Sequence, residues 1–251
     1  MSFKNVLALI LFLFLLNCQQ GKPHLSRIEG HKIEISDSLE TDKSIDSFIT
    51  PYRDHVNKDL DSVICYSMDT YTKNDGELNT AIGNLLADLV YQQANKIFKS
   101  RTGNDIDMVI LNHGGIRSII SKGNITKRTV YEIMPFENSL VVAQVKGTNI
   151  LGAVDYLVGV KRAHPISKLK IVLDKDDNLK SATINNELID PEKIYFIATN
   201  DYLYNGGDHM DFFKPSDSLY VLDYKVRNAI MDYFMETDTI NPKADDRFIK
   251  M

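Results

Sequence analysis

Apolar residues recur at intervals of three and four through residues 80–102, which is the strongest helical pattern in the chain. The repeating positions are Ile82, Leu85, Leu86, Leu89, Val90, Ala94, Ile97 and Phe98. Such spacing places them on one face of a helix. Thr80 or Asn79 suits the N-cap, and Gly103 lies just beyond the expected end of the helix. We therefore predict a long amphipathic helix in this segment.

Short apolar runs alternate with helical patterns in the rest of the chain. The composition predicts strands at 62–72, 106–112, 139–147 and 193–200, and a hairpin at 168–185 with an Asp-Asp-Asn turn. In the first strand we expect Ile64, Tyr66 and Met68 to share a face. Further helices are predicted at 44–61 (with Pro51 in the first turn or at a kink), 125–134 (capped by Thr126), 148–158 and 224–235. Hairpins combined with strand–helix alternation favour an α+β domain with a mixed sheet flanked by helices.

The first eighteen residues have the pattern of an export signal. Lys4 precedes an apolar run, Val6–Leu16, that is too short to span a bilayer comfortably as a mature helix. A leucine three residues before Cys18 resembles a bacterial lipoprotein processing site, although Asn17 replaces the usual small residue. We expect residues 1–18 to be a lipoprotein signal peptide with lipidation at Cys18. The alternative is an ordinary secretory signal with an incidental cysteine.

The remaining residues divide into a tether and a globular part. Residues 19–43 are polar and have no sustained period, so we expect a tether, and residues 44–251 should form a single domain. Hydrophobic residues make up 43% of the chain and charged residues 25%, which predicts a packed core. The net charge of −5 argues against nucleic acid as a partner, although one or two cations could still bind a small anion.

Polar residues suited to ligand contact gather in three predicted loops, at 112–117, 135–138 and 200–208. The first contains a Gly pair, which permits close approach of the backbone, and Arg117, whose forked donors match a phosphate. The other two carry aromatic rings, amides and a Gly-Gly-Asp corner. Each loop alone is more often an ordinary turn. Together they suit a nucleoside, because rings stack on a base and a carboxylate accepts from ribose hydroxyls.

Four motifs in these segments also resemble a known family. Their order along the chain is Asn-x-Gly-Gly-Ile-Arg (112–117), Gly-Asn-Ile-Thr (123–126), Pro-Phe-x-Asn-Ser-Leu-Val (135–141) and Thr-Asn-Asp-Tyr-Leu-x-x-Gly-Gly-Asp (199–208). From about residue 62 to its C-terminus, the chain resembles the C-terminal domain of 5′-nucleotidases, and AIGNLLADLV (81–90) resembles the opening helix of that domain. The resemblance implies that fold and a base held between two aromatic rings. It also implies that hydrolysis belongs to a separate metallophosphatase domain with two metals.

The resemblance implies a substrate-binding set of Asn112, Gly115, Arg117, Phe136, Asn138, Tyr202, Gly207 and Asp208. Phe136 and Tyr202 match the two stacking positions, the second of which is normally phenylalanine. Asp208 matches the ribose-binding aspartate. Family members often carry arginines just before the opening helix, where this chain has only Lys73, so the usual residue for a phosphate contact on that side is missing.

Hydrolytic motifs are not found in the sequence. The six histidines are isolated and do not form the Asp-x-His or Gly-His-x-His patterns of two-metal phosphoesterases. His113-Gly114-Gly115 resembles an esterase oxyanion loop, but the required Gly-x-Ser-x-Gly elbow does not occur, nor does a Walker loop. We therefore assign no catalytic residue, metal ligand or cofactor to this chain. Divalent metals are expected only in a partner metallophosphatase.

The sequence thus predicts the nucleotide-binding domain of a 5′-nucleotidase-type hydrolase, acting in extracytoplasmic nucleotide catabolism with a separate two-metal phosphoesterase chain. It would be an exported bacterial lipoprotein anchored to the membrane and facing the periplasm or cell surface. One alternative is a non-catalytic surface lipoprotein that uses the fold as an interaction module. A less favoured alternative is hydrolysis by this domain alone at an unrecognised site.

Lipidation at Cys18 can be tested by metabolic labelling with a fatty-acid analogue. The wild-type protein should incorporate the label, and Cys18→Ser should not, because the cysteine sulfur is the atom to which the lipid is attached. Cys65→Ser is the matched control and should label like the wild type. Equal labelling of the wild type and Cys18→Ser would show that the cysteine is incidental.

Overall fold

The computed structural model describes residues 25–36 and 38–251, so the predicted signal peptide and Cys18 lie outside the described residues. The chain separates into two compact units, Met1–Ile49 and Thr50–Met251. Residues 25–36 form no regular secondary structure. The predicted boundary between tether and domain at residues 43 and 44 stays a prediction. No helix in the described part of the chain is long and apolar enough to cross a membrane.

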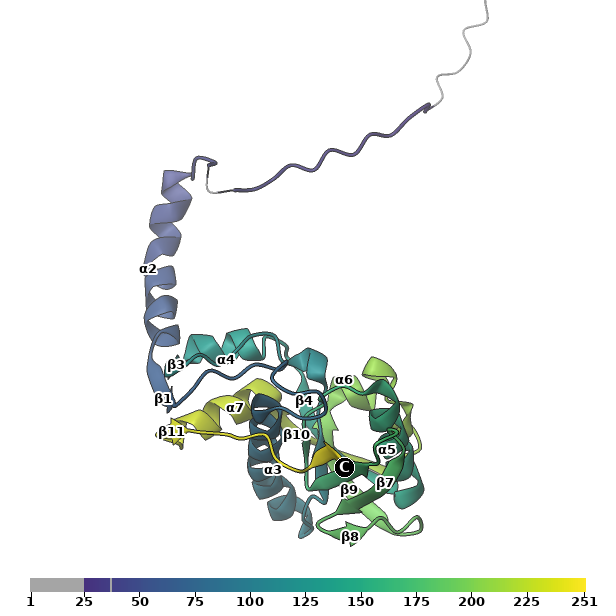
Figure 1. Ribbon diagram of the computed structural model, residues 1–251. Coiled ribbons are helices and arrows are strands. Elements are labelled where there is room, and N and C mark those ends of the chain that lie inside the picture. The colour runs from purple at the N-terminus through teal and green to yellow at the C-terminus, as the bar shows by residue number, and fades with distance from the viewer. Residues whose placement is uncertain (1–24, 37) are drawn as a thin grey trace, which may run out of the picture. The chain divides into compact units, whose positions relative to one another are not determined.

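Helices and strands alternate along the chain from Lys43 onward (Figure 1). The helices are α2 (Lys43–Leu60), α3 (Ala81–Thr102), α4 (Lys127–Ile133), α5 (Gly147–Val160), α6 (Asp201–Tyr204) and α7 (Val226–Met235), with short 3-10 turns η1 (His113–Gly115), η2 (Gly207–His209) and η3 (Asp211–Phe213). The strands are β1 (Val63–Ser67), β2 (Met108–Ile110), β3 (Gly123–Thr126), β4 (Ser139–Lys146), β5 (Ile166–Ser167), β6 (Leu169–Leu173), β7 (Leu179–Ile184), β8 (Glu187–Leu188), β9 (Ile194–Asn200), β10 (Ser218–Lys225), β11 (Thr239–Ile240) and β12 (Phe248–Lys250).

A five-stranded sheet with the order β10-β4-β9-β2-β5 forms the centre of the fold. Strands β2 and β9 are parallel and the other pairs are antiparallel, so the sheet is mixed, as predicted. Two smaller sheets, β11-β1-β3 and β12-β6-β7-β8, complete the domain. The predicted fold class, α+β with a mixed sheet flanked by helices, is confirmed.

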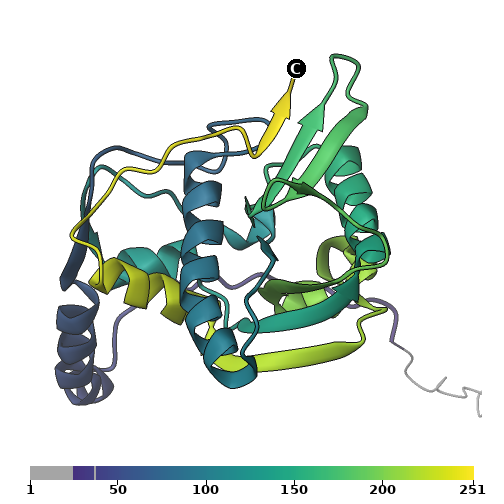
Figure 2. The ribbon, with the colours of Figure 1, turned by 90° about the horizontal axis from the view of Figure 1, so that it is seen from below.

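Side chains alternate across the central sheet and build a separate apolar core on each face. On β2, Val109 joins the core that includes α3 and α7, whereas Met108 and Ile110 join the core that includes α5. Alternation of this kind is the period of two that a strand imposes on its side chains. The sheet is therefore covered on both faces, as Figure 2 shows. Because both faces are buried, strands β2 and β4 consist almost entirely of apolar residues.

The two best-defined predicted helix boundaries are confirmed. The Thr80 hydroxyl caps α3 by accepting a hydrogen bond from the Gly83 N–H at 3.1 Å, and Gly103 ends the helix with a left-handed φ of 77°. Thr126 caps α4 through a capping box with Thr129. Both helices therefore begin where a side-chain oxygen satisfies an N–H group that has no partner within the helix.

The structure narrows two predictions and corrects a third. Pro51 lies inside α2 rather than in its first turn, which leaves the kink as the remaining prediction. Tyr66 and Met68, predicted to share a face, are exposed, and the buried residues of β1 are Cys65 and Ser67; the sequence does not show which face the core covers. The helix predicted from Tyr224 begins at Val226, because the preceding residues form β10, an edge strand that the prediction missed.

The order and directions of the strands bring the three polar loops together. Strands β2 and β9 are parallel, so the segments after their C-terminal ends leave the sheet at the same edge. Strand β4 runs antiparallel to β9, with Leu140 paired to Asn200, so the loop before β4 enters at that edge too. A ligand site at this edge can therefore use all three segments.

Candidate functional site

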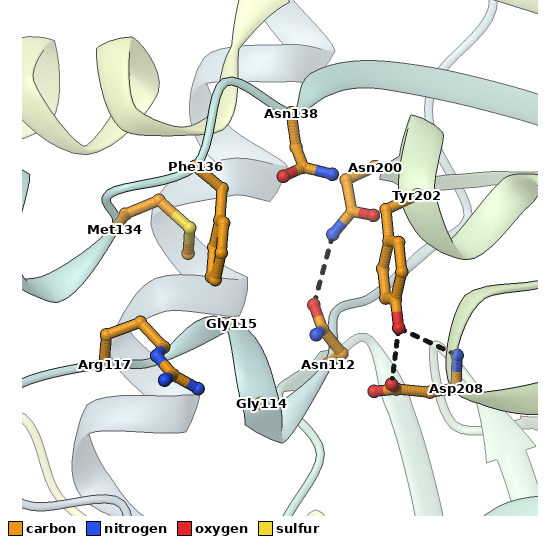
Figure 3. A pocket seen from close by; sticks show the side chains of 10 residues that line it. All are labelled: Asn112, Gly114, Gly115, Arg117, Met134, Phe136, Asn138, Asn200, Tyr202 and Asp208. Carbon is orange, nitrogen blue, oxygen red and sulfur yellow. Dashed lines mark hydrogen bonds between the residues drawn. The ribbon is translucent and has the colours of Figure 1, made fainter. Parts of the chain in front are cut away.

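A cavity of about 310 Å³ lies at this edge of the sheet, within the roughly 300–1,000 Å³ of small-molecule sites. Its lining residues come from all three loops: Asn112, Gly114, Gly115, Arg117, Met134, Phe136, Asn138, Asn200, Tyr202 and Asp208 (Figure 3). Seven of the eight residues of the predicted set are among them. The eighth, Gly207, is not.

Two aromatic rings face each other across the cavity. Figure 3 shows Phe136 on one side and Tyr202 on the other, with Arg117 and Asp208 at the same end of the space between the rings. The side chains of Phe136 and Tyr202 are 41% and 46% exposed. Large apolar rings at a folded surface are usually covered, and two that face one another across a gap leave room for a flat ligand.

One glycine of the pair in the first loop, Gly115, is required by close packing. A Cβ atom on Gly115 would lie 2.9 Å from Asn112 Oδ1, so a larger residue would displace the Asn112 side chain. Asn112 Oδ1 in turn accepts a hydrogen bond from Asn200 Nδ2 at 3.3 Å. The glycine thus lets an amide from the first loop reach an amide at the end of β9.

The backbone around Arg117 is fixed by hydrogen bonds, whereas its guanidinium has no acidic partner among the described residues. Its N–H donates to the Ile133 carbonyl at 2.9 Å, and Lys73 Nζ donates to the Ile116 carbonyl at 2.8 Å. The Arg117 guanidinium lies 5.9 Å from the centre of the Phe136 ring, and no described carboxylate forms a salt bridge with it. Its charge is therefore available to an anion at the rim of the cavity. Lys73, in contrast, is engaged with the loop itself.

A buried arginine that the sequence analysis missed fixes the loop of Phe136. Arg227 on α7 is 7% exposed, and its Nη1 donates to the carbonyls of Met134, Pro135 and Phe136 at 3.1–3.4 Å. Its other terminal nitrogen binds the carboxylate of Glu137, and this hydrogen bond lowers the pKa of Glu137. Three consecutive carbonyls are thus satisfied by one guanidinium, whose donors have the fixed geometry of a planar fork.

The opposite ring is tied to the carboxylate beside it. The Tyr202 hydroxyl donates to Asp208 Oδ1 at 2.9 Å and accepts from the Asp208 N–H at 3.3 Å. The hydrogen bond to this carboxylate is the main cause that raises the pKa of Tyr202. Because phenylalanine lacks a hydroxyl, this link is specific to a tyrosine at the position.

Gly207, the eighth residue of the predicted set, packs against the Tyr202 ring. A Cβ atom on Gly207 would lie 2.5 Å from Tyr202 Cε1, which is inside contact distance. Gly207 therefore lets the ring lie flat against the backbone, and it lines a neighbouring hollow rather than the cavity between the rings. Its part in binding stays a prediction.

Three lining residues were not in the predicted set: Gly114, Met134 and Asn200. Gly114 belongs to the motif at 112–117 and Met134 precedes the motif at 135–141, so these motifs were the available signal. Asn200 caps α6 by accepting the Leu203 N–H at 2.9 Å, and its amide group also donates to Asn112. From the sequence, an asparagine between a strand and a helix is interpreted as an N-cap, and this interpretation does not predict its second contact, to Asn112.

His164 forms part of the wall behind Asp208 and is 4% exposed. Its Nδ1 lies 3.3 Å from the Leu111 carbonyl oxygen and also 3.3 Å from the backbone nitrogen of His113. Burial lowers the pKa of His164 to about 4 and also lowers the pKa of His113. His164 is therefore neutral at pH 7.

In the described part of the chain, no group of three or more His, Cys, Asp or Glu residues is arranged to hold a metal ion.

Comparison with known proteins connects this cavity to one family. The family model for the 5′-nucleotidase C-terminal domain matches residues 59–215, a span that contains all three loops. The cell wall protein Lmo0130 of Listeria monocytogenes is 30% identical over 184 residues, which are 66% of this chain and 22% of that protein. Protein UshA of Escherichia coli is 33% identical over 114 residues, which are 43% of this chain and 20% of that protein.

A solved structure agrees in fold. The 5′-nucleotidase precursor of Thermus thermophilus superposes with a TM-score of 0.69 at 24% identity, covering 82% of this chain and 42% of that one. The present chain thus spans less than half the length of each of these proteins.

Removing the Arg227 guanidinium should loosen the loop of Phe136. We expect Arg227→Met to lower the free energy of unfolding by roughly 2 kcal/mol, because three carbonyls, that of the buried Met134 among them, lose their shared donor. Amide hydrogen exchange at residues 136–138 should become faster. Arg101→Met is the control, because Arg101 also donates to two carbonyls, those of Val221 and Leu222, but lies outside the cavity lining. Unchanged exchange in Arg227→Met would show that the loop does not depend on this contact.

His164 should make stability depend on pH. Its pKa is about 4 in the folded state against an ordinary 6.5, so the unfolded state binds more protons between these values. Stability is therefore lost as the pH falls through this window, by about 2 kcal/mol from pH 7 to pH 5. Urea unfolding at both pH values should show this loss in the wild type and a smaller one in His164→Gln. The exposed histidine variant His55→Gln should keep the wild-type dependence; an equal change in both variants would contradict the assignment.

Proposed function

This chain belongs to the family of 5′-nucleotidase C-terminal domains, and we propose that its cavity binds nucleosides and nucleotides for a 5′-nucleotidase-type hydrolase. One observation carries the proposal. The rings of Phe136 and Tyr202 face each other across an open gap, with an unpaired guanidinium and a carboxylate at one end. This arrangement offers a separate contact to each part of a nucleotide.

The base would lie between the two rings, where stacking on an aromatic side chain stabilises a base by about 1–3 kcal/mol. Asp208 would accept hydrogen bonds from ribose hydroxyls, because one of its oxygens, Oδ1, is bonded to Tyr202 and the other has no such partner. The 5′-phosphate would meet Arg117, whose guanidinium has no described acidic partner. Asn138, whose Nδ2 donates to Asp201 Oδ1 at 3.1 Å, would face the edge of the base with its carbonyl oxygen.

Phosphate hydrolysis would require a two-metal centre supplied from outside these 251 residues. Two divalent metals stabilise both the attacking and the leaving oxygen of a phosphoryl group. We propose that a metallophosphatase domain on a separate chain supplies them and that this chain supplies substrate recognition. The length of the relatives is compatible with this division, because they extend well beyond the part that matches this chain.

We place this activity outside the cytoplasm, on a protein held to the membrane by lipidated Cys18. The sequence of the first eighteen residues supports this location, and one relative is named as a cell wall protein. A hydrolase at this location would act on nucleotides before uptake.

Calorimetric titration of adenosine and AMP tests the proposed ligand. Phe136→Ala should weaken both ligands by about 1–3 kcal/mol, because it removes one stacking ring. Arg117→Ala should mainly weaken AMP, by roughly 1.5–3 kcal/mol, and should reduce the sensitivity of AMP binding to salt, because only the phosphate uses its charge. Lys180→Ala, which removes an exposed cation on β7, is the control and should bind both ligands like the wild type.

Two outcomes would contradict the proposal. If the wild type binds neither adenosine, AMP nor uridine nucleotides at millimolar concentration, the cavity is not a nucleotide site and an interaction module is the better account. If Phe136→Ala binds both ligands as tightly as the wild type, the rings do not hold the base.

A further inference from the structure

A second hollow adjoins the proposed nucleotide cavity on the other side of Asp208. It has a volume of about 750 Å³ and shares Tyr202 and Asp208 with the first cavity. Its remaining wall includes Tyr156, Arg162, His164, Gly207 and His209. The two spaces therefore lie on either side of Tyr202 and of the carboxylate that would receive the ribose.

The second hollow contains one arginine, Arg162, and this cation is unpaired. Arg162 is exposed, and in residues 25–36 and 38–251 its side chain has neither a salt bridge nor a hydrogen bond. Asp208 is the only acidic residue in the wall, and its carboxylate is already hydrogen-bonded to Tyr202. Burial raises the pKa of Tyr156, and Asp208 adds to this shift whereas Arg162 opposes it, so both charges act on the same hydroxyl.

The wall between the two spaces is rigidly built. The Tyr156 hydroxyl donates to the Asp208 carbonyl at 2.7 Å, and the Tyr156 ring packs edge-on against His164 at 5.8 Å. Asp208 and His209 both have left-handed backbone, with φ values of 51° and 61°. Residues in this conformation stay there only when their surroundings fix them. The position of Asp208 relative to the hollow is therefore set before any ligand binds.

The proposed orientation of a nucleotide determines which part of it would face this hollow. If the base lies between the rings and Arg117 holds the 5′-phosphate, the ribose hydroxyls on carbons 2′ and 3′ face Asp208. Substituents on these oxygens point past the carboxylate, toward the space that contains Arg162. Water fills such an open, polar space easily, so a cation there remains hydrated until an anion replaces the water.

We propose that the hollow is a second phosphate subsite, which accepts a phosphate on the 2′- or 3′-oxygen of the ribose. The inference rests on the proposed function and extends it. The preferred ligands are then nucleotides phosphorylated on this edge of the sugar, including 3′,5′-bisphosphates, rather than simple 5′-monophosphates. Arg162 is the principal contact and His209 a second donor, while Asp208 keeps the hydroxyl that remains free.

Titration of the full chain with AMP and with adenosine 3′,5′-bisphosphate tests the subsite. The wild type should bind the bisphosphate roughly tenfold more tightly than AMP, the scale of one charge-assisted contact. In Arg162→Ala the ratio of the two affinities should fall close to one, and Arg162→Lys should keep part of it. Lys161→Ala is the matched control, because Lys161 is the neighbouring cation but is paired with Asp177 at 2.6 Å. It should keep the wild-type ratio, as should Arg117→Ala.

A ratio near one in the wild type would overturn the subsite, and so would a ratio that survives in Arg162→Ala. Either result alongside normal AMP binding that depends on Phe136 would leave the proposed function intact. Loss of all binding, of AMP and adenosine included, would overturn both proposals together.

Discussion

The position of Phe136 depends on a buried guanidinium. Arg227 lies on the final helix, far along the chain from the loop at 134–137, yet it donates to three carbonyls of that loop and pairs with Glu137. Without this guanidinium the carbonyl of the buried Met134 would lose its donor, which costs about 1–3 kcal/mol for a buried group. Helix α7 thus determines where one wall of the cavity lies, without contributing a residue to the lining.

The opposite wall is fixed by different means. Gly207 lies directly under the Tyr202 ring, and the hydroxyl of that ring binds both the carboxylate and the N–H of Asp208. The Tyr202 ring and the Asp208 carboxylate therefore form one unit. Asn112 and Asn200 join the first and third loops in the same way, through one amide contact at the floor of the cavity. A polar network with most of its partners satisfied resists rearrangement, so the cavity is largely preformed.

The two proposed phosphate positions lie on either side of this unit. Arg117 and Arg162 are the cations of the two spaces, and neither has an acidic partner among the described residues. By contrast, Lys73 and Lys161 are both engaged, one with the Ile116 carbonyl and the other with Asp177. A cation that has no acidic partner can meet a phosphate, whereas a cation that is already paired supports the fold.

The sequence by itself determined the helices with strong periodicity and side-chain caps, the buried strands and the three polar loops. These features depend on residues close in the chain, such as Thr80 with Gly83 or Thr126 with Thr129. Only the tertiary structure decided which face of β1 is buried, that β10 exists as an edge strand, and that Gly207 supports a ring instead of lining the cavity. It also decided that Arg227 meets the loop at 134–137 and that the side chain of Arg162 has no described partner. Both features depend on which segments distant in sequence come together in the fold, and no local pattern of residues records this.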